Sequence, residues 1–230
     1  MRAKKCDQPL LLSVYDYTGN WAKPYVDAGW RVILWDYKVE GCILERFGWL
    51  CSMIDEENDG YVDGLLAAPP CTAFASSGAR WWTDKDRSGT GPHPFRSFTE
   101  YMEALTRIVL VMVEKFSPRF WALENPIGRI EKVVPELKPY RRLAFDPCDY
   151  GDAYTKRTII YGNFNPHLKK TPVLPTEGSK MHRLPPSIDR AGIRSATPQG
   201  FAKAFYQANK LQGKPVTISL ESKLSLLEAI

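Results

Sequence analysis

Short apolar runs alternate with amphipathic or polar stretches along the first half of the chain, and this alternation restricts the fold more than any other feature. Three runs have the length and residue types of buried strands, and they cover residues 9–15, 30–37 and 61–70. Residues 21–29 have a helical pattern, and we interpret the polar stretch 38–60 as a loop. This order predicts an α/β fold with a doubly wound, mostly parallel, Rossmann-like sheet.

The second half of the chain extends this sheet. Apolar side chains recur every three or four residues over 97–116, as on one face of a helix. Residues 120–123 resemble a short buried strand that ends at Glu124. The runs within 141–151 and 155–164 predict two further strands, an antiparallel pair at the sheet edge.

Two polar segments interrupt the pattern. Residues 72–97 contain glycines, prolines and charges of both signs, which is typical of a long mobile loop. Residues 165–189 are rich in proline and predict extended coil. A last helix over 198–212 should begin with Thr197 as its N-cap and Pro198 at its first position.

The 230 residues suit a single domain, 1–230, because a chain of this size can bury a core of its own. With 44% hydrophobic and 25% charged residues, the composition argues against a disordered or fibrous protein. No apolar run approaches the roughly 18 residues that span a bilayer, and the first one is too short for a signal peptide. We therefore expect a cytoplasmic monomer with no membrane partner. The net charge of +5 favours a polyanionic partner only weakly.

The cysteines give little support to disulfides or metal sites. They form an odd set without a CxxC pair, which argues against a disulfide framework and a zinc ribbon. The five are Cys6, Cys42, Cys51, Cys71 and Cys148. We expect free thiols and no metal.

Ligands of an open parallel sheet collect at the carboxyl ends of its strands, so the residues that follow each predicted strand are candidates for a site. The first strand is followed by the turn from Asp16 to Asn20, in which Gly19 permits a close approach of a ligand. Asp36 follows the second strand, seventeen residues after Gly19, where a carboxylate would bind a ribose. The alternative is an ordinary tight turn and an exposed Asp.

Cys71 directly follows two prolines at the end of the third strand. The prolines restrict the backbone, so the thiol is held in one direction and can serve as a nucleophile. The alternative is a buried cysteine that acts as a small hydrophobic residue. Glu124 leaves the core at the end of its strand and can hold a proton, or else caps the next turn. Lys156 and Arg157 can offer a cation to an oxygen atom, or form a solvated strand end.

In chain order, these segments resemble the motifs of the cytosine-5 DNA methyltransferase family over residues 10–208. The similar pairs are Tyr17–Asn20 with FSGxG, Pro69–Thr72 with PPCQ, Glu124–Pro126 with ENV, Thr155–Thr158 with QxRxR and Arg194–Pro198 with GNSVP. The phrases GARWW and YTKRT are typical of compact members encoded by phages. For such a member, the host cytoplasm is the expected location.

The resemblance implies the fold of S-adenosylmethionine-dependent methyltransferases and transfer of a methyl group to carbon 5 of cytosine in DNA. Cys71 would add to carbon 6 of a flipped base while Glu124 holds or protonates ring nitrogen 3. Arg157 would be the cation near the carbonyl oxygen of the base, with Lys156 as second choice. The cofactor S-adenosyl-L-methionine, or a modified relative of it, would be bound by Asp16, Tyr17, Thr18, Gly19, Asp36, Asp55, Pro69 and Ser195.

The resemblance also assigns two segments. Residues 72–97 would close over the base as an active-site loop. Contacts to DNA would come from Arg80, Trp81, Trp82, Lys85 and Arg87. Residues 163–193 stand where the family usually has a target-recognition domain of a hundred residues or more, so we expect low sequence specificity.

The chain departs from the family pattern in several positions. Thr72 replaces the usual glutamine, Asp36 the usual glutamate, and the glutamine and first arginine of QxRxR have no counterpart. These departures leave open a methyltransferase that acts on tRNA or free nucleotides, and a non-catalytic DNA-binding decoy with the same fold. A zinc-dependent cytosine deaminase would need HxE and PCxxC, which the chain lacks.

Overall fold

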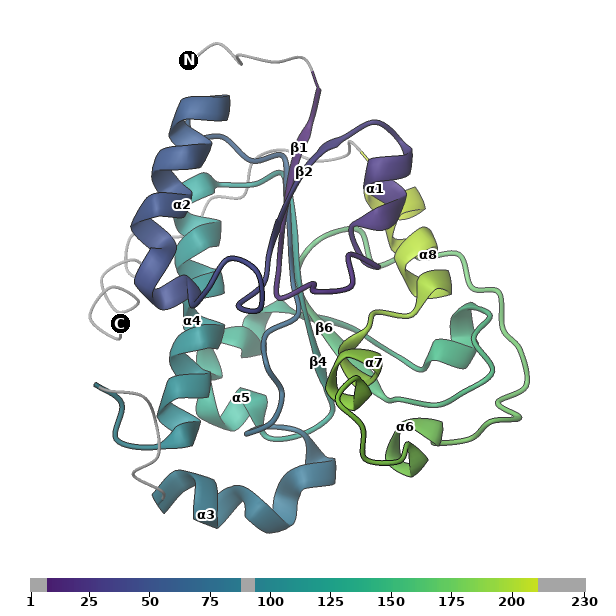
Figure 1. The fold of residues 1–230 in the computed structure, drawn as a ribbon. Coiled ribbons are helices and arrows are strands. Elements are labelled where there is room, and N and C mark those ends of the chain that lie inside the picture. The colour runs from purple at the N-terminus through teal and green to yellow at the C-terminus, as the bar shows by residue number, and fades with distance from the viewer. Residues whose placement is uncertain (1–7, 88–93, 211–230) are drawn as a thin grey trace.

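The computed structural model describes residues 8–87 and 94–210. Its centre is a six-stranded sheet with the order β2-β1-β3-β4-β6-β5 (Figure 1). The strands are β1 (Leu10–Val14), β2 (Arg31–Trp35), β3 (Gly64–Ala67), β4 (Phe120–Pro126), β5 (Arg141–Phe145) and β6 (Thr158–Asn163). The four strands β2, β1, β3 and β4 are parallel to one another, and β6 runs antiparallel to both β4 and β5. The predicted mostly parallel α/β sheet with an antiparallel pair at its edge is confirmed.

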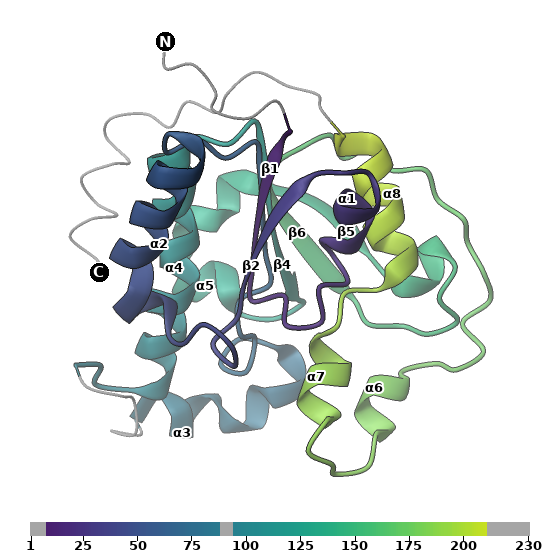
Figure 2. The ribbon, with the colours of Figure 1, turned by 45° about the horizontal axis from the view of Figure 1, so that its top comes forward.

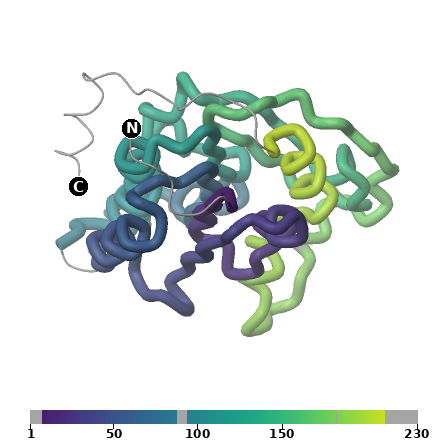
Figure 3. The backbone as a smooth tube through the Cα atoms, turned by 90° about the horizontal axis from the view of Figure 1, so that it is seen from above, coloured from purple at the N-terminus to yellow at the C-terminus, as the bar shows by residue number. Residues whose placement is uncertain are grey.

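Helices cover both faces of the sheet (Figures 1 and 3). One layer contains α2 (Ile43–Asn58), α4 (Phe98–Phe116) and α5 (Ile130–Val133), and the other contains α1 (Lys23–Asp27) and α8 (Gln199–Asn209). Each layer encloses a separate cluster of buried apolar side chains against the sheet. The sheet is thus buried on both faces, and its strand ends remain as the places where polar side chains can gather.

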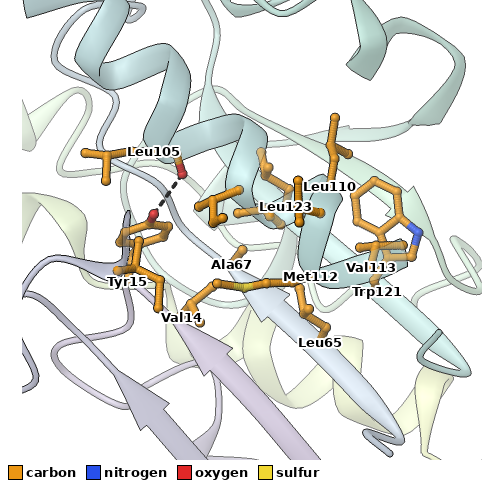
Figure 4. Close-up of a cluster of buried hydrophobic side chains, with 14 of the residues drawn as sticks. Val14, Tyr15, Leu65, Ala67, Leu105, Leu110, Met112, Val113, Trp121 and Leu123 are labelled. Carbon is orange, nitrogen blue, oxygen red and sulfur yellow. Dashed lines mark hydrogen bonds between the residues drawn. The ribbon is translucent and has the colours of Figure 1, made fainter. Parts of the chain in front are cut away.

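The larger cluster joins β1, β3 and β4 to α4 (Figure 4). Leu65, Met112 and Leu123 are fully buried within it. Tyr15 follows β1 with a left-handed φ of 61°, and its hydroxyl donates to the Leu105 carbonyl oxygen at 2.7 Å. This packing fixes the end of β1 against α4.

The helix predicted over 97–116 is confirmed, and Ser97 is its N-cap. The Ser97 Oγ accepts a hydrogen bond from the Glu100 amide at 3.1 Å, which satisfies one of the free donors of the first turn. The last helix begins one residue later than we predicted, with Pro198 and not Thr197 as its N-cap. Thr197 is buried, and its carbonyl oxygen accepts from Asn20 Nδ2 at 3.3 Å.

The predicted loop at 38–60 is wrong, because most of it forms helix α2. Ile43, Leu50 and Ile54 are buried at helical spacing among many polar residues. Leu44, Phe47 and Met53 pack against the same cluster, so the helical spacing was present in the sequence. The polar residues at the two ends of 38–60 led us to interpret the whole stretch as a loop. Two parallel strands also require a long crossover between them, and α2 provides it between β2 and β3.

The prediction of a loop over 72–97 is wrong for residues 76–87, which are helical. Residues Ser76–Trp81 form a 3-10 helix, η1, and Trp82–Arg87 form α3. Residues 88–93 of this predicted loop lie outside the described part of the chain. Ion pairs and hydrogen bonds hold α3 to the rest of the protein, as shown below.

Short helices occur in segments without a periodic pattern. They are η2 (Pro135–Tyr140), η3 (Pro147–Tyr150), α6 (Lys180–Arg183) and α7 (Arg190–Ser195). Helix α6 interrupts the segment 165–189 that we predicted to be coil, and α7 follows that segment directly. Helices α3, α6 and α7 all lie beyond the carboxyl edge of the parallel strands (Figures 1 and 2).

Two features bear on ligands and membranes. The four cysteines of the described residues are free, and Cys6 lies outside them. Among residues 8–87 and 94–210, no helix is both long and apolar enough to cross a membrane.

Candidate active site

The parallel strands bring the sequence-predicted residues to one edge of the sheet. Asp16 and Asp36 follow β1 and β2, Cys71 follows β3, and Glu124 lies near the end of β4. Because β3 and β4 pair in register from Gly64↔Phe120 to Ala67↔Leu123, the chain segments beyond them emerge side by side. The edge therefore combines a nucleophile and a carboxylate from neighbouring strands.

Cys71, Glu124 and Lys156 form an interacting group at this edge. The Lys156 Nζ lies 3.5 Å from the Glu124 Oε1, and their side chains are only 16% and 7% exposed. Cys71 is partly exposed. Burial raises the pKa of the Cys71 thiol and the Glu124 charge raises it further, whereas the Lys156 and Arg194 charges lower it. The thiol is thus close enough to all three charges to respond to them.

The Glu124 carboxylate is only partly satisfied. Its Oε1 is buried and has no hydrogen-bond partner among the described residues, although Lys156 is nearby. A buried oxygen of this kind is costly unless a ligand or a proton completes it. The arrangement suits a carboxyl group that binds a donor on a ligand.

The end of β4 also holds the backbone around Cys71 on both sides. Asn125 Nδ2 donates to the Pro69 carbonyl oxygen at 3.3 Å, before the cysteine, and Arg129 Nε donates to the Ala73 carbonyl oxygen at 2.9 Å, after it. The Phe74 and Ala75 amides both donate to the Cys71 carbonyl oxygen at 2.9 Å and form a tight turn. The segment that carries Glu124, together with Arg129 just beyond it, therefore fixes the backbone that bears Cys71.

Arg129 connects this turn to α3. Its guanidinium binds the Asp86 carboxylate at 2.7 and 2.8 Å, and it lies over the Trp82 ring at 4.7 Å. The hydrogen bonds to Arg129 lower the pKa of Asp86. At the neighbouring position only glycine fits, because a Cβ on Gly128 would lie 1.9 Å from the Phe74 carbonyl oxygen.

We predict that Arg129→Lys lowers the free energy of unfolding by about 1–2 kcal/mol. The lysine ammonium cannot donate to the Asp86 carboxylate and the Ala73 carbonyl oxygen at the same time, as the planar guanidinium does. Urea unfolding would measure the change. The control is Arg141→Lys, which alters the exposed pair with Glu131 and should change stability by less than about 0.5 kcal/mol. Equal losses in the two variants would contradict the role of Arg129.

The structure places the two basic candidates in different surroundings. Arg157 is 51% exposed and pairs with Asp146 at 3.2 Å, whereas Lys156 turns toward Glu124. The two residues precede β6 and are adjacent in the chain, so their side chains take different directions. Of the two, Lys156 is the one that lies beside the Glu124 carboxylate.

Part of the predicted cofactor group is also brought together. Gly19 has a φ of +66°, and a Cβ there would lie 3.5 Å from the Leu34 side chain of the neighbouring strand. Asp36 is largely buried, and its Oδ1 accepts from the Lys38 amide at 3.0 Å. Nothing among the described residues donates to its Oδ2. Tyr17 and Thr18 are exposed in the same turn, with Lys38 Nζ 4.1 Å from the Tyr17 ring centre.

The other predicted cofactor residues have different surroundings. The Asp16 carboxylate points inward, where its Oδ2 accepts from Ser13 Oγ and the Ala22 amide, both at 3.1 Å. Pro69 is buried and uses its carbonyl oxygen to bind Asn125. Asp55 lies in the last turns of α2, near the opposite edge of the sheet, and the exposed Ser195 bonds within α7. Asp55 is therefore remote from the Gly19 turn, whereas Ser195 stands two residues before Thr197, whose carbonyl oxygen accepts from Asn20 of that turn.

The predicted DNA-binding residues divide into two groups. Trp82 packs beneath Arg129, and Lys85 donates to the Thr72 carbonyl oxygen, so both support the fold of α3. Arg80, Trp81 and Arg87 are exposed, and Arg80 lies 5.2 Å from the Trp81 ring centre. Only the second group is available to a partner.

Sequence analysis missed three residues of this site. Asn125 and Arg194 appeared only as members of quoted motifs, without a role of their own, and Arg129 gave no signal in spacing or periodicity. Arg194 lies far from Cys71 in the chain, yet its charge lowers the pKa of the thiol. Only the folded structure reveals these contacts.

A scan of protein-family models finds no match, and a search of the curated proteins finds none either. Among solved structures, the chain is similar to a protein described as a DNA modification methyltransferase encoded within a prophage (E. coli), with 12% identity and a TM-score of 0.45. It is also similar to the methyltransferase EhMeth of Entamoeba histolytica, with 12% identity and a TM-score of 0.42, and to a mutant of DNMT2 from Spodoptera frugiperda, with 15% and 0.40.

These three similarities cover 68%, 80% and 68% of this chain. They cover 47%, 62% and 50% of the other chains, so the protein spans about half the length of these structures.

Proposed function

We propose that this protein is a DNA cytosine-5 methyltransferase that uses S-adenosylmethionine and forms a covalent adduct through Cys71. The observation that carries the proposal is the group of Cys71, Glu124 and Lys156 at the carboxyl edge of the sheet. A thiol, a carboxyl group and an ammonium beside one another can attack a pyrimidine ring, hold a proton on it and balance charge on its oxygen.

The residues around Gly19 fit an adenosine-bearing cofactor. The turn admits a ligand near the backbone, and the Asp36 Oδ2 is open to the hydroxyl groups of a ribose. The exposed side chains of Tyr17, Leu34 and Tyr37 offer apolar surface to an adenine ring. We assign the binding of S-adenosylmethionine to Tyr17, Thr18, Gly19 and Asp36. When bound, this cofactor supplies the methyl group that carbon 5 of the base accepts.

Proton transfer at the site follows from the charges around Cys71. Because the pKa of the thiol is raised, sulfur keeps its proton at neutral pH and must lose it as the attack begins. Glu124 is the neighbouring base, and we assign it the transfer of that proton to ring nitrogen 3. The sulfur electron pair forms the bond to carbon 6, and the electrons of the ring double bond move to carbon 5. Once carbon 5 carries the methyl group, its proton leaves to solvent and the electrons of that bond re-form the ring double bond. Cys71 departs as a thiolate and recovers, through Glu124, the proton held on nitrogen 3.

Trapping of a covalent complex is the test of this proposal. DNA that contains 5-fluorocytosine should form a denaturation-resistant adduct with the protein in the presence of S-adenosylmethionine, because fluorine prevents the final proton loss. Labelled methyl transfer should be compared on duplex DNA, single-stranded DNA, tRNA and dCMP. Label in tRNA or dCMP alone would reject DNA as the substrate, and the absence of both transfer and adduct would reject the enzyme in favour of a DNA-binding protein.

Lys156→Met should lower kcat by about 10²-fold, because the variant removes the cation beside Glu124 and the base. The matched control is Arg157→Met, which removes a cation at the adjacent position, where it is exposed and paired with Asp146. It should change kcat by less than about threefold. Steady-state methylation of DNA measures both, and a larger loss in Arg157→Met would restore our original ranking.

A further inference from the structure

A projecting arm lies beside the site and has no role in the chemistry described so far. We define the arm as residues 178–195, which contain α6 and α7 and extend beyond the carboxyl edge of the sheet (Figures 1 and 2). It occupies most of the second half of the proline-rich segment 163–193. The arm is the part of that segment nearest to the reactive groups.

Both ends of the arm are fixed to the site. Where it begins, the Thr155 amide donates to the Gly178 carbonyl oxygen at 2.9 Å, directly before Lys156 in the chain. Just before this, the Glu177 amide donates to the Ala153 carbonyl oxygen at 2.9 Å. Beyond its other end, the Thr197 carbonyl oxygen accepts from Asn20 of the Gly19 turn. The base of the arm therefore lies between the catalytic group and the cofactor residues.

The tip of the arm is solvated and carries one large apolar side chain. Pro185 to Asp189 are all exposed, and Ile188 is 95% exposed. Pro185 and Pro186 restrict the backbone before it, and the Arg190 amide donates to the Ser187 carbonyl oxygen at 3.3 Å after it. An isoleucine is thus presented on a restrained turn, without packing partners.

The charge of the arm suits a polyanion. It carries Lys180, Arg183, Arg190 and Arg194 against a single acid, Asp189. Lys180 is paired with Glu177 at the base, and Arg183 donates to the Glu177 carbonyl oxygen at 2.9 Å. At the other end of the arm, the Arg194 charge lowers the pKa of the Cys71 thiol. On the opposite side of the edge, η1 and α3 present the exposed Arg80, Trp81 and Arg87. Positive charge therefore flanks the reactive thiol on both sides.

We propose that the arm is the element that engages duplex DNA, and that Ile188 inserts between bases to hold the duplex open beside the target cytosine. This inference rests on the proposed function. An apolar side chain that enters a base step compensates for stacking lost when a base leaves the helix, and the arginines bind the adjacent phosphates. A free nucleotide would need neither feature.

The test compares the same plasmid DNA in its native duplex form and after heat denaturation. With labelled S-adenosylmethionine, Ile188→Ser should lower the rate of methyl transfer to duplex DNA by about tenfold or more, because unstacking costs a few kcal/mol. The rate on denatured DNA should change by less than about twofold, since its bases are already accessible. Leu174→Ser is the matched control, because Leu174 is 80% exposed outside the arm, and it should leave both rates unchanged.

Each outcome decides the inference. Equal rates of Ile188→Ser and wild type on duplex DNA would overturn it, and so would equal losses on both forms, which would indicate a defect in chemistry or folding. A wild-type protein that methylates only denatured DNA would overturn it as well. A wild-type protein inactive on both forms would reject the proposed function itself, and the inference would fall with it.

Discussion

Replacement of Cys71 by serine is expected to abolish methyl transfer to DNA, with a loss of at least about 10⁴-fold in kcat. The same variant should form no covalent adduct with 5-fluorocytosine. A hydroxyl is a much weaker acid than a thiol, and neither Glu124 nor Lys156 would make serine a comparable nucleophile. Transfer of labelled methyl groups and a denaturing gel of the trapped complex give the two measurements. The fold should persist, because serine differs from cysteine by one atom at a partly exposed position.

Cys148→Ser is the control for this result. Cys148 is also a free, partly exposed thiol. It lies in η3, which follows the end of β5. It should retain methyl transfer and adduct formation at close to wild-type levels. An active Cys71→Ser variant, or an inactive Cys148→Ser variant with Cys71 intact, would place the nucleophile elsewhere.

Glu124→Gln should move two properties of the site in opposite directions. Methyl transfer should fall by about 10² to 10⁴-fold, because glutamine can neither take the thiol proton nor deliver it to the base. Alkylation of Cys71 by iodoacetamide at pH 8 should become faster. The Glu124 charge raises the pKa of the thiol, so its removal lowers that pKa and increases the thiolate fraction.

Mass spectrometry of the Cys71 peptide follows the alkylation and separates it from reaction at the other cysteines. Glu57→Gln serves as the control, since Glu57 pairs with Arg31 on the surface and both rates should remain unchanged. A loss of methyl transfer with slower alkylation would mean that the substitution had displaced Cys71, and Glu124 would then have a structural role.

The sheet could be predicted because its central strands are buried and separated by residues with a different period. β1, β3 and β4 appear in the sequence as short apolar runs, and α4 shows its buried face every three or four residues. α2 was missed because polar residues at both ends of 38–60 drew attention away from the apolar positions between them, of which Ile43, Leu50 and Ile54 are buried. Helix α3 was missed because contacts to Arg129, distant in the chain, stabilise it.

The site could be predicted as far as topology determines it. Parallel strands deliver the residues after them to one edge, so Asp36, Cys71 and Glu124 were found from strand ends alone. Spacing does not reveal the direction of a side chain. The Asp16 carboxylate binds Ser13 and Ala22 inside the turn, and Arg157, next to Lys156, turns to Asp146. Such choices depend on partners that come from other parts of the chain.

The attachment of the Cys71 turn to the end of β4 has a consequence for how this protein tolerates change. Asn125 and Arg129 donate hydrogen bonds to the backbone on either side of Cys71. The thiol and the Glu124 carboxylate are therefore held by one connected part of the backbone. A substitution at Asn125 or Arg129 should therefore disturb the position of the thiol relative to Glu124, although both reactive side chains are unchanged.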